Sequence, residues 1–126
     1  MTFRHVCDTE GCYIKTQTPD WGFLDNSFSG RIRVGDIDGI VEANGHLLIL
    51  EWKRTSAELT RGQEIMFVRC TAINDITVFL VHGCPKDTIV NNLIIYANGM
   101  ITLETAATNG MLQEYCRLWE REVRSR

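Results

Sequence analysis

The chain has no long apolar run. No stretch approaches the ~18 to 20 uncharged apolar residues that a membrane-spanning helix needs, and the first ten residues lack the apolar core of a signal peptide. Internal repeats and low-complexity tracts are also missing. These absences predict a soluble, intracellular and cytoplasmic protein with no membrane partner.

The cysteines form no C-x-x-C pair, and their odd number argues against a disulfide framework and for a reducing compartment. The five are Cys7, Cys12, Cys70, Cys84 and Cys116. Most of them should be small buried hydrophobic residues. Cys7 and Cys12, with His5 beside them, could supply part of a zinc site, although their spacing is wide and no second pair follows. The alternative is a turn near the N-terminus, and an iron-sulphur cluster is not supported.

There is little excess of charge: 13 Lys and Arg stand against 16 Asp and Glu, a formal charge of −3. This balance does not favour a nucleic-acid binder, because such proteins use an excess of Lys and Arg to neutralise phosphates. A metal-dependent nuclease, however, concentrates carboxylates in its site, and bound cations reverse the local field. The position of the basic residues therefore matters more. Those that we expect to contact nucleic acid are Arg31, Arg33, Arg54 and Arg61.

A hydrophobic share of 44% in 126 residues allows one continuous core. We expect a single domain over residues 1–126, with a loop-rich segment 1–30, a motif-bearing core 31–82, and strands and a helix in 83–126. A short strand is expected at residues 12 to 16 and a turn at Pro19-Asp20.

The central segment predicts a β-hairpin. Residues 31 to 42 alternate in type, Asn44-Gly45 favours a tight turn, and residues 46 to 53 form the return strand. The apolar stretch from residue 47 to 50 indicates a strand that is covered on both faces.

Helix and strand patterns follow. Residues 55 to 58 match a capping box that starts a helix over residues 56 to 71. A strand at residues 75 to 82, two strands around Asn98-Gly99 within residues 88 to 103, and an amphipathic helix at 110 to 124 complete an α/β (α+β) fold.

Strand alternation would place Asp36 and Asp38 on one face, and Glu51 and Lys53 on one face of the return strand. The hairpin then brings Asp38 close to Glu51. Neighbouring carboxylates repel unless one takes up a proton or both bind a cation. Mg²⁺ prefers such oxygen ligands, and the Trp52 backbone carbonyl would be a further one. Lys53 could activate the attacking water. Asp36 is either a second ligand or a polar residue on the same face.

The run Gly35-Asp36-Ile37-Asp38, followed by Glu51-Trp52-Lys53 and by a helix with Gln63 and Phe67, closely resembles the PD-(D/E)XK nuclease superfamily, in particular its RecB-type branch. Phe67 stands where that branch has Tyr. The resemblance implies a restriction-endonuclease-like mixed central β-sheet flanked by helices. It also implies Mg²⁺ or Mn²⁺ dependence, cleavage of DNA, and a Glu or His on a preceding helix. His5 and Glu10 are candidates for this residue, although the sequence pattern does not predict such a helix.

The leading hypothesis is therefore a small nuclease, with catalytic residues Asp38, Glu51, Lys53 and Gln63, that acts on DNA as a homodimer and is encoded by a phage or mobile element. The alternative is a catalytically silent module of the same fold that binds nucleic acid or a protein. A third is a zinc-dependent interaction domain. Residues with weaker claims are Trp21, Trp52 and Trp119, which are either core residues or base-stacking residues, and His46 and His82, which are expected to be polar termini.

Overall fold

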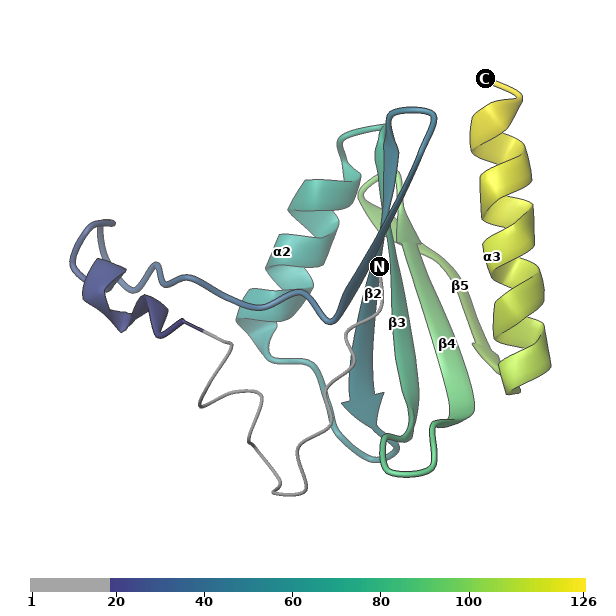
Figure 1. The fold of residues 1–126 in the computed structure, drawn as a ribbon, viewed down its shortest axis with the longest axis horizontal. Coiled ribbons are helices and arrows are strands. Elements are labelled where there is room, and N and C mark those ends of the chain that lie inside the picture. The colour runs from purple at the N-terminus through teal and green to yellow at the C-terminus, as the bar shows by residue number, and fades with distance from the viewer. Residues whose placement is uncertain (1–18) are drawn as a thin grey trace. The chain divides into compact units, whose positions relative to one another are not determined.

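The computed structural model describes residues 19–126. Internal contacts divide the chain into two compact units, residues 1–36 and residues 37–126. The larger unit is an α+β fold with a five-stranded mixed sheet and a helix on each face (Figure 1). Its elements are β1 (Gly39–Ala43), β2 (His46–Arg54), α2 (Arg61–Thr71), β3 (Ile76–Cys84), β4 (Ile89–Ala97), β5 (Met100–Ala106) and α3 (Asn109–Arg124).

The strands lie in the sheet in chain order, β1-β2-β3-β4-β5. Neighbours are antiparallel except β2 and β3, which are parallel and are joined through α2. The two predicted Asn-Gly turns are confirmed. Asn44 and Gly45 have φ of 53° and 80°, and Asn98 and Gly99 have φ of 57° and 77°. Positive φ at both central residues defines the hairpin turn that matches strand twist.

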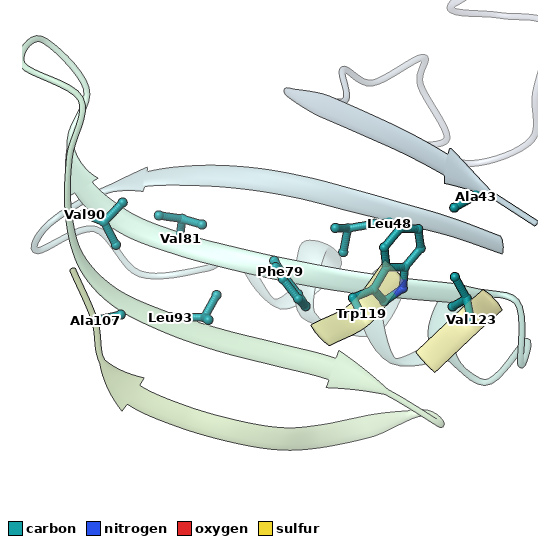
Figure 2. Close-up of a cluster of buried hydrophobic side chains, with 9 residues drawn as sticks. All are labelled: Ala43, Leu48, Phe79, Val81, Val90, Leu93, Ala107, Trp119 and Val123. Atoms are coloured by element: carbon teal, nitrogen blue, oxygen red, sulfur yellow. The ribbon is translucent and has the colours of Figure 1, made fainter. Parts of the chain in front are cut away.

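The sheet has a separate hydrophobic cluster on each face. On the α2 face, Phe67 packs with Val78, Leu80 and Tyr96. On the α3 face, Trp119 and Val123 lie over side chains from the strands, as Figure 2 shows. The residues of this second cluster are Ala43, Leu48, Phe79, Val81, Val90, Leu93, Ala107, Trp119 and Val123. Since successive residues 78 to 81 are all buried, β3 is the strand that is covered on both faces.

The prediction of a strand from residue 31 is wrong, because β1 begins only at Gly39 and residues 32 to 38 are irregular. The Trp52 N–H, which a continuing ladder would have bonded, donates instead to Asp38 Oδ2 at 2.8 Å. Such side-chain acceptors compete with the strand ladder. Because residues 36 and 38 are not in a strand, strand alternation does not place Asp36 and Asp38 on one face.

The predicted helix start is also wrong. Thr55 and Glu58 do not form the capping box, and α2 begins at Arg61. Thr60 is the N-cap: its hydroxyl accepts from the Gln63 N–H, and Gln63 Oε1 accepts from the Thr60 N–H, both at 3.2 Å. The same T-x-x-E/Q pattern thus occurs twice, and the second copy caps the helix because its two reciprocal bonds form.

The remaining elements of the larger unit are confirmed with small shifts. The strand predicted at residues 75 to 82 is β3, the two strands around Asn98 are β4 and β5, and the closing helix is α3. Within residues 19–126 no helix is long and apolar enough to cross a membrane.

The three cysteines that the structure describes, Cys70, Cys84 and Cys116, are free thiols of intermediate burial rather than fully buried. Burial raises the pKa of the Cys116 thiol, which keeps it protonated and weakly reactive. Cys7 and Cys12, together with the strand predicted at residues 12 to 16, lie outside the described residues.

The smaller unit is described from residue 19 onward. It contains a short 3₁₀ helix, η1 (Trp21–Leu24), whose N-cap Asp20 accepts the Gly22 N–H through Oδ1 at 2.8 Å. This is an Asx-type turn, as expected at Pro19-Asp20. Arg33 lies 3.8 Å from the Asp25 carboxylate and donates to its backbone carbonyl.

The structure leaves no room for a side chain at Gly83, so a larger residue there should destabilise the protein. The β3–β4 register shifts between His82 and Gly83, and a Cβ at Gly83 would lie 2.1 Å from the Ile89 carbonyl oxygen. We expect Gly83→Ala to lower the free energy of unfolding by about 1–3 kcal/mol or more, measured by urea denaturation. The matched control is Gly62→Ala, since a Cβ there meets nothing within 4 Å. Equal stability of the two variants would contradict the close approach.

Candidate functional site

Asp38 and Glu51 line one shallow hollow beside the β1–β2 hairpin, together with Leu50 and Trp52. Asp38 stands directly before β1, whose first residue Gly39 is the Cα partner of Leu50. The hairpin thus brings the two residues to one part of the surface, although Asp38 stands before the strand and not within it.

The Trp52 carbonyl is directed toward the same edge. The N–H and C=O groups of one strand residue point to the same neighbour, and the Trp52 N–H donates to Asp38. Since β1 begins at Gly39, no strand residue lies opposite Trp52 on that side. The hydrogen bond also fixes one oxygen of the Asp38 carboxylate and leaves the other available.

These groups form a donor set of two carboxylates and one carbonyl. All are hard oxygen donors, and Mg²⁺ is commonly bound by one or two carboxylates with water in its remaining positions. The set fits Mg²⁺ or Mn²⁺ in its chemistry. Within residues 19–126 no group of three His, Cys, Asp or Glu side chains is placed to hold a metal ion, so such an ion would depend on the carbonyl and on water.

Glu51 and Lys53 share the face of β2 that α2 covers. They pair with Leu80 and His82 of β3, and Leu80 belongs to the cluster around Phe67. Glu51 is only 9% exposed, and in the described part of the chain the other buried polar residue is Thr71. Thr71 is satisfied within its helix, where its hydroxyl donates to the Phe67 carbonyl. A carboxylate buried in a sheet face is unusual and marks Glu51 as a functional candidate.

His82 lies next to Lys53 and was not predicted as a site residue. Its Nε2 is 3.0 Å from the Ala57 carbonyl oxygen. Because a carbonyl only accepts, Nε2 carries a proton, and in the neutral ring Nδ1 then presents a lone pair. That Nδ1 atom is buried and has no hydrogen-bond partner. We expected His82 to be a polar residue at a strand end with its hydrogen bonds satisfied. In the structure only one of its two ring nitrogens has a partner. A parallel alignment of residues 47 to 54 with residues 76 to 83 would have shown that His82 lies next to Lys53.

Gln63 lies in the first turn of α2. The structure gives it a role in capping the helix, which the sequence interpretation did not include. Its backbone and side chain both bond Thr60 in the capping box. A role of Gln63 in ordering the site or contacting substrate stays a prediction.

The other predicted residues divide by position. Arg54 ends β2 and Arg61 begins α2, and both are exposed, so a phosphate can reach them. Asp36, Arg31 and Arg33 belong to the smaller unit, whose position relative to the site is not defined. Their roles stay predictions. His5 and Glu10 lie outside the described residues, as does the zinc candidate of His5, Cys7 and Cys12.

Comparisons of the chain with protein-family models, with curated proteins and with solved structures found no match. The resemblance to the PD-(D/E)XK superfamily therefore stays a prediction based on the motif residues.

The position of the helix cap is testable. We expect Thr60→Ala to lower the free energy of unfolding by about 1 kcal/mol, the typical value of an N-cap hydroxyl, in chemical denaturation. Gln63→Ala should act in the same direction, whereas Gln63→Glu keeps the reciprocal bond and should retain stability. Thr55→Ala is the matched control. If it cost as much as Thr60→Ala, the helix would begin earlier than the structure shows.

Proposed function

We propose that the protein is a metal-dependent nuclease that hydrolyses phosphodiester bonds of DNA. The observation that carries the proposal is the hydrogen bond from the Trp52 N–H to the Asp38 carboxylate. It joins Asp38, directly before the first strand, to the Glu51-Trp52-Lys53 run of the second. The proposed partners are DNA and, because so small a chain offers little surface for gripping a duplex, a second copy of the protein.

Asp38, Glu51 and the Trp52 carbonyl would hold Mg²⁺ or Mn²⁺. When bound, the ion would supply Lewis-acid polarisation of a phosphate and a water of lowered pKa. Asp38 uses one oxygen for the Trp52 N–H, which fixes the orientation of the carboxylate before any ligand arrives.

Lys53 would orient the attacking water and stabilise the charge that develops on the phosphate oxygens. Its neighbour His82 offers a buried Nδ1 lone pair, which can accept a hydrogen bond from the Lys53 ammonium and so position it. Arg54 and Arg61 would contact backbone phosphates, and Gln63 would order the site from the start of α2.

A second candidate is a catalytically silent module of this fold that binds nucleic acid or a protein. It is favoured by the lack of a three-residue metal-binding group within residues 19–126. Calorimetric titration with Mn²⁺ and Mg²⁺ separates the two functions, because the silent module predicts no uptake.

The central test uses substitutions that keep the fold. Asp38→Asn retains an oxygen for the Trp52 N–H but loses the charge. Lys53→Met retains the aliphatic stem but loses the ammonium. We expect each to reduce metal-dependent cleavage of labelled DNA by about a hundredfold or more, with an unchanged unfolding midpoint. Asp38→Asn should also weaken Mn²⁺ binding in calorimetry, whereas Lys53→Met should not.

The matched control is Lys86→Ala, an exposed lysine in the turn between β3 and β4. Cleavage by this variant should equal that of the unaltered protein. Undiminished cutting by both Asp38→Asn and Lys53→Met would refute the proposed site. A panel of linear, branched and single-stranded DNA together with RNA defines the substrate in the same assay.

His82 should act through Lys53. We expect His82→Leu to lower kcat about tenfold or more, while KM for DNA and the dissociation constant for Mn²⁺ stay unchanged. His82→Gln, whose amide can both donate to Ala57 and accept from Lys53, should recover part of the rate. An unchanged kcat in His82→Leu would show that the imidazole serves only to tie residues 55 to 60 to the sheet.

A further inference from the structure

The hollow beside Asp38 and Glu51 adjoins the proposed metal site and has apolar walls. It measures about 240 Å³, which is less than the roughly 300–1,000 Å³ of sites that enclose a whole small molecule. It therefore has room for one group of a larger ligand rather than for a complete ligand. Besides the two acidic residues and Gly39, it is lined by Leu50, Trp52, Val81 and Leu112. We call this site the apolar hollow.

The four apolar side chains belong to the α3 face of the sheet. Val81 lies in the cluster beneath α3 (Figure 2), and Leu50, Trp52 and Leu112 pack against that cluster. Trp52 is half-buried, and its indole Nε1 is buried, so the part of this side chain that lines the hollow is hydrocarbon. These walls therefore hold a ligand group by stacking and apolar contact, without selecting its polar edges.

A ligand that reaches both the carboxylates and the walls must combine a phosphate or another metal-bound group with a flat apolar group close to it. The Asp38 carboxylate is oriented by the Trp52 N–H, and in the proposed function it binds the ion that takes up a substrate phosphate. In a DNA strand each phosphate is one sugar away from a base, and the faces of bases stack on aromatic side chains. A base next to the bound phosphate is therefore the group that fits the apolar hollow.

An unpaired strand delivers such a base more readily than a duplex does. In a duplex the bases are paired and stacked inside, so that a base reaches a protein hollow only after unpairing and unstacking, which cost free energy. Duplex binding also depends on many phosphate contacts by Lys and Arg. The chain has 13 of these residues against 16 Asp and Glu, so it gains little from a long double-stranded backbone.

We propose that the substrate is an unpaired DNA strand, one base of which enters the apolar hollow and lies against Trp52 and Leu112 while the adjoining phosphate is bound at Asp38. The inference rests on the proposed function, because a phosphate at Asp38 is what brings a base to the hollow. It predicts a preference for single strands over duplex. It also predicts little preference among the four bases, since the walls make no hydrogen bonds to base edges.

The first test compares the binding of three labelled DNAs by fluorescence anisotropy, with Ca²⁺ and with EDTA. They are a short oligodeoxythymidylate, the same strand paired with oligodeoxyadenylate, and a strand of equal length built from abasic nucleotides, which keeps the phosphates and removes the bases. We expect the single strand to bind about fivefold or more tightly than either of the other two, as expected for at least one stacked base.

The second test removes the stacking surface. Trp52→Leu keeps an apolar side chain but loses the ring, and it should abolish the difference between oligodeoxythymidylate and the abasic strand while binding of the abasic strand stays unchanged. If this variant fails to fold, Leu112→Trp serves instead, because it fills the hollow from α3 and should reduce the same difference. Leu118→Trp is the matched control, since Leu118 is an exposed leucine of α3 that does not line the apolar hollow.

The inference is overturned if duplex or abasic DNA binds as tightly as oligodeoxythymidylate, or if the folded variants keep the full difference. It is also overturned if no DNA binds, which would leave the hollow to a protein side chain. Cleavage distinguishes this failure from that of the proposed function. A protein that prefers single strands but cuts no DNA refutes the nuclease alone, whereas one that binds and cuts duplex as well as single strands refutes the inference alone.

Discussion

The parallel pairing of β2 with β3 is the constraint from which the rest of the larger unit follows. Parallel neighbours need a crossover, and α2 provides it on one face of the sheet. β3 then lies in the middle of the sheet with residues 78 to 81 buried in succession, which requires cover on the second face too. The closing helix α3 supplies that cover through Trp119 and Val123. Both helices are therefore consequences of one strand that cannot face water.

The same pairing determines what can be near Glu51 and Lys53. Strand alternation turns both side chains toward α2, and the parallel register places His82 beside Lys53. The crossover returns through residues 55 to 60, where the Ala57 carbonyl meets the His82 ring and Thr60 caps α2. The helix cap, the imidazole and the lysine thus belong to one end of the sheet.

Much of this arrangement could be predicted from sequence because it depends on local signals. Asn44-Gly45 and Asn98-Gly99 adopt positive φ at both residues, and the apolar runs of β2 and β3 became central strands. The errors arose where two local signals competed. The alternating residues 31 to 38 resemble a strand, but a carboxylate took the N–H that the ladder needed. Two capping patterns followed each other within residues 55 to 63, and only the bonded geometry shows that Thr60 is the cap. His82 was missed because its neighbourhood depends on a parallel register that no short-range pattern specifies.

The fold requires a hydrogen-bond acceptor at residue 38, but it does not require the negative charge of an aspartate. Its structural task is to accept one N–H at the point where β1 begins, and the side-chain oxygen of an asparagine would accomplish it without a charge. The Asp38 carboxylate also lines one shallow hollow together with Glu51 and Trp52. The hairpin therefore does not account for the charge on Asp38, whereas the proposed function gives that charge a task, which is to bind a cation.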